Sequence, residues 1–151
     1  MPPHDVVIRQ FRTEDRGRVA ELLSRLSAES LYHRFHSAGV QVDAAVLDSV
    51  TDGYTLVAEL DGTLIGLASC SGANAELGIV VDDGCQRRGI GGTLCRELLR
   101  GAERAGVRKV AAMIMRSNHA MLRLLQSQDW PLLHASGGPV FEVTIQLGTW
   151  T

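Results

Sequence analysis

The sequence predicts an α+β fold in which helices flank one central mixed, mostly antiparallel β-sheet. Two strand-like runs joined by Asp61-Gly62 predict a hairpin, because this dipeptide tolerates the positive φ angles of a tight turn. Apolar residues recur at helical spacing after Gly89, directly behind a third strand-like run. Residues 140–147 alternate between apolar and polar, which is typical of a strand with one buried face.

The N-terminal third is interpreted as one strand followed by short helices. Residues 6–11 resemble a strand, and Thr13 is expected to cap the next helix, whose apolar residues from Val19 to Leu26 lie at i, i+3, i+4 and i+7. Ser27 is expected to cap a second helix that contains residues 30–36. Asp43 is expected to cap a third short turn.

The remaining elements are predicted from periodicity and turn residues. They are, in order, a hairpin over residues 54–60 and 63–71, a strand over 75–81, a long helix from Gly89 to about 105, a strand over 107–115, a helix opened by Ser117 or Asn118, and two strands, the last over 140–147. Gly106 is a good stop for the long helix. This order predicts a single domain over residues 6–148, preceded by an N-terminal tail, residues 1–5.

Composition limits the class of protein. The chain has 151 residues, 45% of them hydrophobic, and a formal net charge of −2, so no general basic footprint points to nucleic acid. Three cysteines without metal-ligand spacing indicate free thiols in a reducing compartment. No apolar run approaches the roughly 18 residues of a membrane span, and the N-terminus has no apolar signal region. We therefore expect a cytoplasmic protein that binds neither nucleic acid nor membrane.

The segment between the third strand and the long helix reads Gln86-Arg87-Arg88-Gly89-Ile90-Gly91-Gly92. Glycines at a helix start let unpaired backbone N–H groups approach an anion, and the helix dipole and two arginines add to the attraction. A Walker loop is excluded, because the only lysine of the chain is Lys109. A dinucleotide fingerprint is excluded because its third glycine position holds Leu94. The segment thus predicts a phosphate or pyrophosphate site, with an ordinary glycine-rich turn as the alternative.

The pattern Gln-x-x-Gly-x-Gly between strand and helix resembles the coenzyme A signature of the GNAT N-acetyltransferases, and the element order is similar to the GNAT fold over nearly the entire chain. Asn118, Met121, Leu124 and Leu125 occupy the family's second signature, Asn-x-x-Ala-x-x-Leu-Tyr. Leu125 stands in place of the tyrosine that protonates the departing thiolate in many members. Asp129-Trp130 stands in place of Gly-Phe.

A narrower resemblance covers the N-terminal segment. Ile8-Arg9, Glu14-Asp15 and residues 26–35 are similar to the acetyltransferase module of bacterial Pat-type protein lysine acetyltransferases. In that group the module is often fused to a cyclic-nucleotide-binding or acyl-CoA-synthetase-like domain, and neither fits in this chain. The resemblance implies a protein lysine as acceptor, for example on an acyl-CoA synthetase.

The family resemblance implies acetyl-CoA as the cosubstrate, and no metal. The backbones of Ile79 and Val81 would hold the pantetheine arm, and a backbone N–H near Val80 or Val81 would stabilise the oxyanion. The pyrophosphate would be held by Gln86, Arg87, Arg88, Gly89, Gly91, Gly92 and Thr93. Asn118 would position the cofactor near the thioester. Each residue also has a structural alternative, namely core packing, a solvated basic turn or a helix cap.

Transfer of an acetyl group to an amine requires a base, because a lysine amine is protonated at neutral pH. Glu76 lies on the candidate strand with Gly78 on the same face, and its burial is expected to help it accept a proton. A solvated or arginine-paired carboxylate is the alternative. Tyr32 and Arg34 are candidate acceptor contacts, because the first helices of this fold often line the acceptor site.

Other interpretations remain open at this stage. His33-x-x-His36 lacks a third metal ligand, and Cys85 has no histidine placed to activate it, so a surface histidine pair and a small packing residue are favoured. The leading hypothesis is an acetyl-CoA-dependent N-acetyltransferase acting on a protein lysine. The alternatives are a small-molecule amine acceptor, or a non-catalytic module that binds acetyl-CoA.

Overall fold

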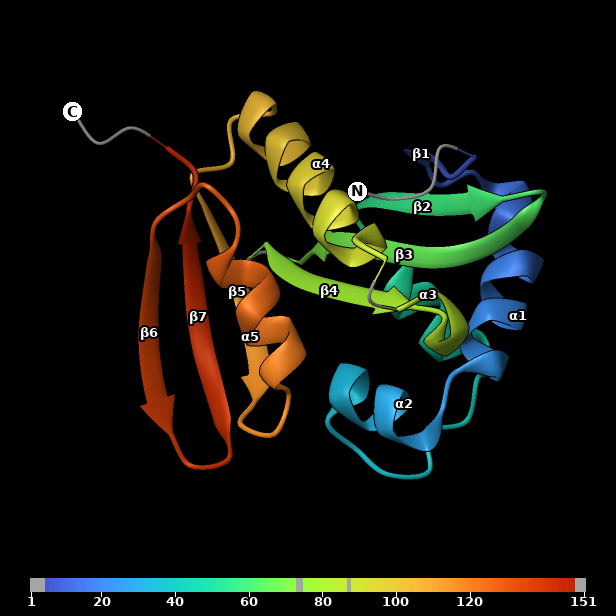
Figure 1. Ribbon diagram of the computed structural model, residues 1–151, viewed down its shortest axis with the longest axis horizontal. Helices are drawn as coiled ribbons and strands as arrows, with labels where there is room; N and C mark the ends of the chain where they lie inside the picture. The colour runs from blue at the N-terminus through green and yellow to red at the C-terminus, as the bar shows by residue number, and fades with distance from the viewer. Residues whose placement is uncertain (1–4, 73–74, 87, 149–151) are drawn as a thin grey trace.

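The computed structural model describes residues 5–72, 75–86 and 88–148, and Figure 1 shows how the elements are arranged. In chain order these are β1 (Val7–Gln10), the 3₁₀ turn η1 (Thr13–Asp15), α1 (Arg16–Arg25), α2 (Ala28–Phe35), α3 (Ala44–Val50), β2 (Tyr54–Leu60), β3 (Thr63–Ser71), β4 (Glu76–Val81), the 3₁₀ turn η2 (Asp83–Cys85), α4 (Ile90–Arg104), β5 (Lys109–Met115), α5 (His119–Gln126), β6 (Leu132–Gly137) and β7 (Val140–Gln146). The strand order along the chain is the predicted one.

The strands of the described chain form one sheet in the order β1-β2-β3-β4-β5-β7-β6. All neighbours are antiparallel except β4 and β5, which run parallel. The β2–β3 hairpin turns at Asp61 and Gly62, whose φ angles are +50° and +81°, as the sequence predicted. The predicted class, an α+β domain with a mixed, mostly antiparallel sheet, is confirmed.

Helices cover both faces of the sheet. On one face α4 and α5 pack in a core that includes Leu77 of β4, and on the other face α1 and α3 pack in a core that includes Val80. Successive side chains of a strand point to opposite faces. Glu76 and Gly78, which alternate in phase with Val80, therefore face the side of the sheet where α2 contacts β4.

Of the three helix caps predicted in the N-terminal third, two are confirmed and one is wrong. The Ser27 hydroxyl accepts a hydrogen bond from the Ser30 N–H, and the Asp43 carboxylate accepts one from the Val46 N–H. Thr13 caps no helix, because the turn η1 begins at Thr13 itself and α1 begins after Asp15. The last-but-one strand, β6, was expected without residue bounds.

A buried ion network connects β1, α1 and β2. The side chain of Asp15 is 0% exposed, and it accepts hydrogen bonds from Arg9 at 2.7 and 2.9 Å, from Arg18 at 2.6 Å and from the Arg12 N–H at 2.8 Å. Arg9 also donates to Glu59 at 2.7 Å. The hydrogen bonds from Arg9 hold the pKa of Asp15 well below its ordinary value, against the opposite effect of burial. Asp15 thus has a structural role, since its carboxylate connects β1 to the start of α1.

We expect Asp15→Asn to lower the free energy of unfolding by about 3 kcal/mol, because it leaves buried arginine charge without its partner. Urea denaturation measures the change. Asp48→Asn is the matched control, since Asp48 pairs with Arg16 at the surface and its side chain is 71% exposed. That exposed pair is expected to contribute less than about 1 kcal/mol.

The stability difference should also depend on pH. A carboxylate whose pKa is lowered by folding contributes its full stabilisation above the unfolded pKa, which is about 4, and loses it as the pH falls toward the folded value. The curves for the wild type and Asp15→Asn should therefore converge between about pH 5 and pH 2. A difference that stays constant over this range would contradict the assignment.

Candidate active site

The parallel strands β4 and β5 are joined at one end only. Glu76 pairs with Ala111, and the Ala111 N–H donates to the carbonyl of Ala75 at 3.0 Å. Between the described residues of the two strands no further pair forms, so β4 has no strand partner on its β5 side from Leu77 to Val81. Backbone N–H and C=O groups require partners when they are shielded from water. The open edge of β4 is therefore a row of groups able to bind an extended ligand.

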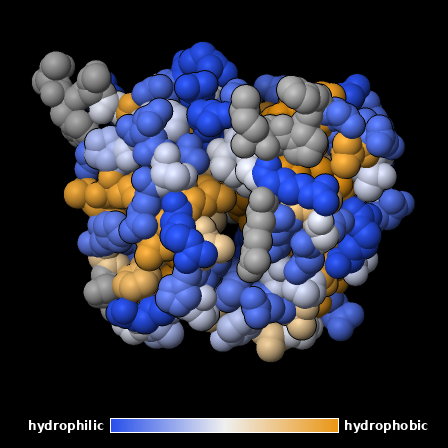
Figure 2. Space-filling view, viewed as in Figure 1, coloured by the Kyte–Doolittle hydropathy of each residue, from blue (hydrophilic) through white to orange (hydrophobic). Residues whose placement is uncertain are grey.

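A cavity of about 680 Å³ lies at this opening. Its walls come from α2, β4, the segment before α4, the end of β5 and α5. Figure 1 shows α2 and α5 on opposite sides of the space beside β4, and Figure 2 shows a hollow near the middle of the same face. The cavity is lined by most of the predicted site residues: Arg34, Glu76, Ile79, Val80, Val81, Gln86, Gly89, Gly91, Gly92 and Asn118.

The glycines at the start of α4 have distinct structural reasons. Gly89 is the N-cap with a φ of +79°, a conformation that favours glycine. A Cβ at Gly91 would lie 3.0 Å from Cδ1 of Leu124, so this glycine also allows α4 to pack against α5. Gly92 has more space, since its Cβ would lie 3.9 Å from Nε2 of Gln128. All three backbones remain at the cavity wall.

Gln86 and Asn118 are polar residues of the cavity wall that also form hydrogen bonds within the fold. The Gln86 amide donates to the carbonyl of Val81 at 3.1 Å, which ties the loop to the end of β4. The Asn118 side chain accepts a hydrogen bond from the Met121 N–H at 3.1 Å and caps α5. Both residues also line the cavity, so each combines a structural role with a position at the cavity wall.

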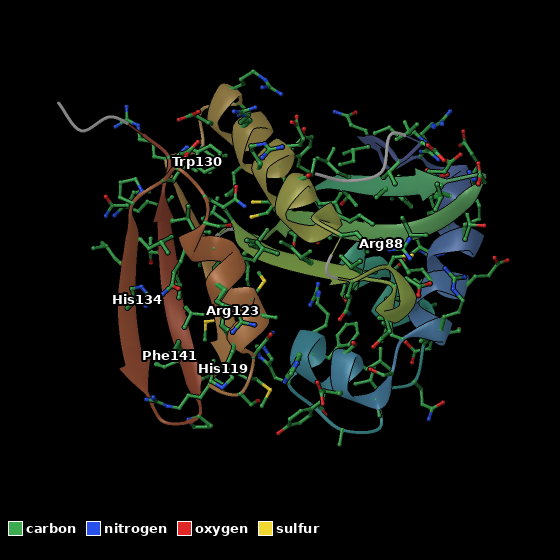
Figure 3. All side chains as sticks on the ribbon, viewed as in Figure 1. Arg88, His119, Arg123, Trp130, His134 and Phe141 are labelled. Atoms are coloured by element: carbon green, nitrogen blue, oxygen red, sulfur yellow. The ribbon has the colours of Figure 1, made fainter. Side chains whose placement is uncertain are left out.

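Some predicted residues lie away from the cavity. Thr93 donates its hydroxyl to the carbonyl of Gly89 at 2.9 Å and lines a separate cavity of about 360 Å³ beside β1 and β2. Arg88 is exposed, and Figure 3 shows it near the start of α4. Tyr32 is 39% exposed and is not a lining residue. Arg87 lies outside the described residues.

Glu76 and Arg34 occupy the same wall. The side chain of Glu76 is exposed at the cavity, so the expected burial is wrong. Arg34 is half-buried, and its guanidinium lies directly over Gly78, where a Cβ would collide with it. Burial lowers the pKa of Arg34, while the charge of Glu76 acts in the opposite direction. The glycine at position 78 therefore makes room for an arginine next to the candidate base.

Leu125, the replacement for the expected tyrosine, is 0% exposed and belongs to the core beneath α5. It does not line the cavity, whereas its neighbour Leu124 does. The position thus contributes packing, and no side-chain proton donor is available from it.

Sequence reasoning missed the contributions of the β5–α5 segment to the cavity. His33 of α2 is hydrogen-bonded to the hydroxyl of Ser117 at 3.3 Å, so a contact crosses between the two sides. His119 and Arg123, labelled in Figure 3, line the cavity from α5. The helical spacing of these two residues was a usable signal, because positions four apart share a helix face.

The structure also bears on metal binding, cysteine chemistry and membrane spanning. The described residues contain no group of three His, Cys, Asp or Glu side chains arranged for a metal. Cys70, Cys85 and Cys95 are free, and Cys85 does not line the large cavity. Burial raises the pKa of the Cys95 thiol to about 12. No helix among the described residues has the length and apolar character needed to cross a membrane.

A mixed sheet that opens between two parallel strands, with a glycine-rich helix start beside the opening, is an arrangement suited to an extended ligand with an anionic end. The family model of the acetyltransferase (GNAT) family matches residues 18–130. The chain therefore belongs to this family and is an N-acetyltransferase.

Similar proteins agree with this assignment. An acetyltransferase of Pseudomonas aeruginosa is 29% identical over 129 residues, which cover 77% of this chain and 69% of that protein. The GNAT domain of S. lividans PAT has a TM-score of 0.81 at 21% identity, covering 92% of this chain and 89% of the other. The structure of yncA from Salmonella typhimurium, solved with its cofactor acetyl-CoA, has a TM-score of 0.72 at 20% identity, covering 97% and 96%. The two structures support the fold.

Gly89→Ala should lower the free energy of unfolding by about 1–2 kcal/mol, because alanine is strained at a φ of +79°. Gly17→Ala is the matched control. Gly17 lies within α1 with open space around its Cα, so alanine there should raise stability by up to about 1 kcal/mol. Thermal or urea unfolding of both variants checks the opposite signs, and equal effects would contradict the conformation assigned to Gly89.

Proposed function

We propose that this chain transfers the acetyl group of acetyl-CoA to an amine, namely a protein lysine, with Glu76 as general base. One observation carries the proposal. The open edge of β4 begins next to Glu76 and ends near the glycine-rich start of α4, and all three border one cavity of about 680 Å³. A long cofactor with a phosphate end and a reactive end fits such an arrangement.

The residues along this path suit the parts of the cofactor. An extended pantetheine arm can hydrogen-bond to the backbone of Ile79 and to the N–H of Val81, as an added strand would. The carbonyl of Val81 already accepts from Gln86. The first N–H groups of α4 have no partner within the helix and suit a pyrophosphate, beside the backbones of Gly89, Gly91 and Gly92. Arg88 adds positive charge next to this end. Thr93 is a weaker candidate, because its hydroxyl already bonds Gly89.

The proposed reaction requires removal of a proton from the acceptor amine. When bound, acetyl-CoA supplies an acetyl thioester, whose C–S bond breaks as the new C–N bond forms. A lysine amine has a reference pKa of about 10.4, so it must lose a proton before it attacks. Glu76, exposed at the cavity wall, can accept that proton and release it to solvent.

Two further points concern the developing charges. A backbone N–H of β4 is proposed to stabilise the oxyanion, at Val81 in preference to Val80. Val81 faces the free edge beside the cavity, whereas Val80 alternates in phase with Asp82, whose N–H donates to Ile65 of β3. Leu125 cannot protonate the leaving thiolate. A thiol with a pKa of about 8.5 is a tolerable leaving group without this help.

A protein acceptor is favoured by the resemblance of residues 26–35 to Pat-type lysine acetyltransferases. This segment forms α2, and four of its residues line the cavity: Glu29, Ser30, His33 and Arg34. An acyl-CoA synthetase is the first acceptor to test. The three free cysteines agree with the cytoplasmic location proposed from the sequence.

Calorimetric titration should detect binding of acetyl-CoA to the wild type, and Gly92→Glu should abolish it. Position 92 is preferable to Gly91, where a side chain would meet Leu124 and disturb the packing of α4 on α5. Gly92→Gln has the same bulk without the charge and should retain weakened binding. Absence of binding by the folded wild type at millimolar acetyl-CoA would remove the proposal.

Glu76→Gln should lower kcat by about 100-fold or more while leaving the dissociation constant of acetyl-CoA unchanged, because the amide cannot accept the proton. The measurement is steady-state acetylation of a lysine acceptor across pH, with calorimetry as the binding control. Glu29→Gln, another cavity carboxylate, is the matched comparison. An unchanged kcat in Glu76→Gln would exclude it as the base.

A further inference from the structure

Arg34 carries a charge for which no described residue serves as an ion-pair partner. Its guanidinium lies over Gly78 and lines the cavity, yet among the described residues it forms neither a hydrogen bond nor an ion pair. The guanidinium also lies against the ring of Phe35, whose centroid is 5.1 Å from the guanidinium carbon. Other arginines, such as Arg9, Arg16 and Arg25, are paired with carboxylates. The five N–H donors of Arg34 are therefore available to a ligand in the cavity.

The unpaired state of Arg34 has a physical cost. A half-buried guanidinium has lost part of its hydration, and burial accordingly lowers its pKa. The nearest opposite charge that acts on it is Glu76, but the two do not form an ion pair. A planar guanidinium matches a carboxylate through two parallel hydrogen bonds. A ligand carboxylate would thus satisfy Arg34 while leaving Glu76 free to receive a proton.

The phosphates of the cofactor are poorly placed to be this partner. The glycine-rich segment follows Val81 at the far end of β4, and Gly78 lies three residues before Val81, which corresponds to about 10 Å of strand. The neighbour of Arg34 on its own wall is instead Glu76, the proposed base. Arg34 therefore belongs to the acceptor end of the cavity.

We propose that Arg34 binds a carboxylate of the acceptor, held close to the amine that Glu76 deprotonates. The inference rests on the proposed function and names the acceptor class, an amine with a neighbouring carboxylate. The positive amine would lie at Glu76 and the negative carboxylate at Arg34, so the two charges of the acceptor match these two neighbouring charges of the cavity wall. An acidic residue beside a target lysine and a free amino acid supply the same chemistry.

Gly78 has a defined part in this arrangement. A Cβ at this position would meet the Nη2, Cζ and Nε atoms of Arg34, so Gly78→Ala must displace the guanidinium. We expect this variant to reproduce the loss of carboxylate recognition without removing any charge. A purely supportive role of Arg34 in folding would give no such selectivity.

The test compares acceptors that differ only in the carboxylate. One pair is a lysine peptide with glutamate beside the lysine and the same peptide with glutamine, and the other is an amino acid and its carboxamide. For the wild type, kcat/KM should be about 10- to 100-fold higher for the acid of at least one pair, mainly through KM. Which pair responds identifies the source of the carboxylate.

The variants assign this preference to Arg34. Arg34→Met, which keeps an unbranched side chain but removes the guanidinium, should remove the preference. Arg34→Lys should retain part of it because the charge persists without the fork. Both should bind acetyl-CoA as the wild type does. Arg100→Met, at an exposed site on α4, is the control and should keep the full preference.

Direct calorimetry of acceptor binding, with acetyl-CoA absent, gives a readout independent of turnover. The wild type should bind the acidic member of a pair more tightly than the amide member. Arg34→Met should bind both members equally. Equal binding and turnover of acid and amide by the wild type would overturn the inference, as would a preference that survives in Arg34→Met. Failure of the proposed function has a different signature, namely no binding of acetyl-CoA by the folded protein.

Discussion

The parting of β4 from β5 is the constraint on which the functional part of the structure depends. A parallel pair would ordinarily satisfy its backbone groups along its whole length, but here the pairing is limited to Glu76 and Ala111. The rest of the sheet makes this interruption tolerable. β3 pairs β4 from Glu76 to Val81 on one side, and β7 pairs β5 from Lys109 to Met115 on the other. Each strand is thus supported by an antiparallel neighbour while its inner edge stays open.

The elements around this opening are positioned by packing that is independent of any ligand. Leu124 and Gln128 connect α5 and the turn after it to the glycines at the start of α4, so the glycine-rich end of the cavity lies at a helix–helix contact. On the opposite face, the ion network around Asp15 joins β1, α1 and β2. These contacts explain why glycines occur at the start of α4 and why a charged residue, Asp15, is buried beside α1.

The charged residues Glu76 and Arg34 of the cavity wall are not paired with each other, whereas charged residues elsewhere in the fold form ion pairs. Asp15 is paired with Arg9 and Arg18, and hydrogen bonds from Arg9 lower the pKa of Asp15. Glu76 and Arg34 share a wall without pairing, so both remain able to interact with a bound molecule. Unpaired charge costs stability, and proteins keep it mainly where a ligand will complete the arrangement.

Local patterns in the sequence determined the elements of this protein. Period-2 and period-3.6 spacing, the Asp61-Gly62 turn and the caps at Ser27 and Asp43 depend on neighbouring residues, and the structure agrees with them. The same holds for the residues of the glycine-rich segment, of which Gln86, Gly89, Gly91 and Gly92 line the cavity. The tertiary structure alone decided that Asp15 is a buried ion partner, that Thr93 points to another cavity, that Glu76 is exposed, and that Arg34 lies over Gly78. These properties depend on residues distant in the chain, since exposure and charge pairing arise only when separate elements pack together.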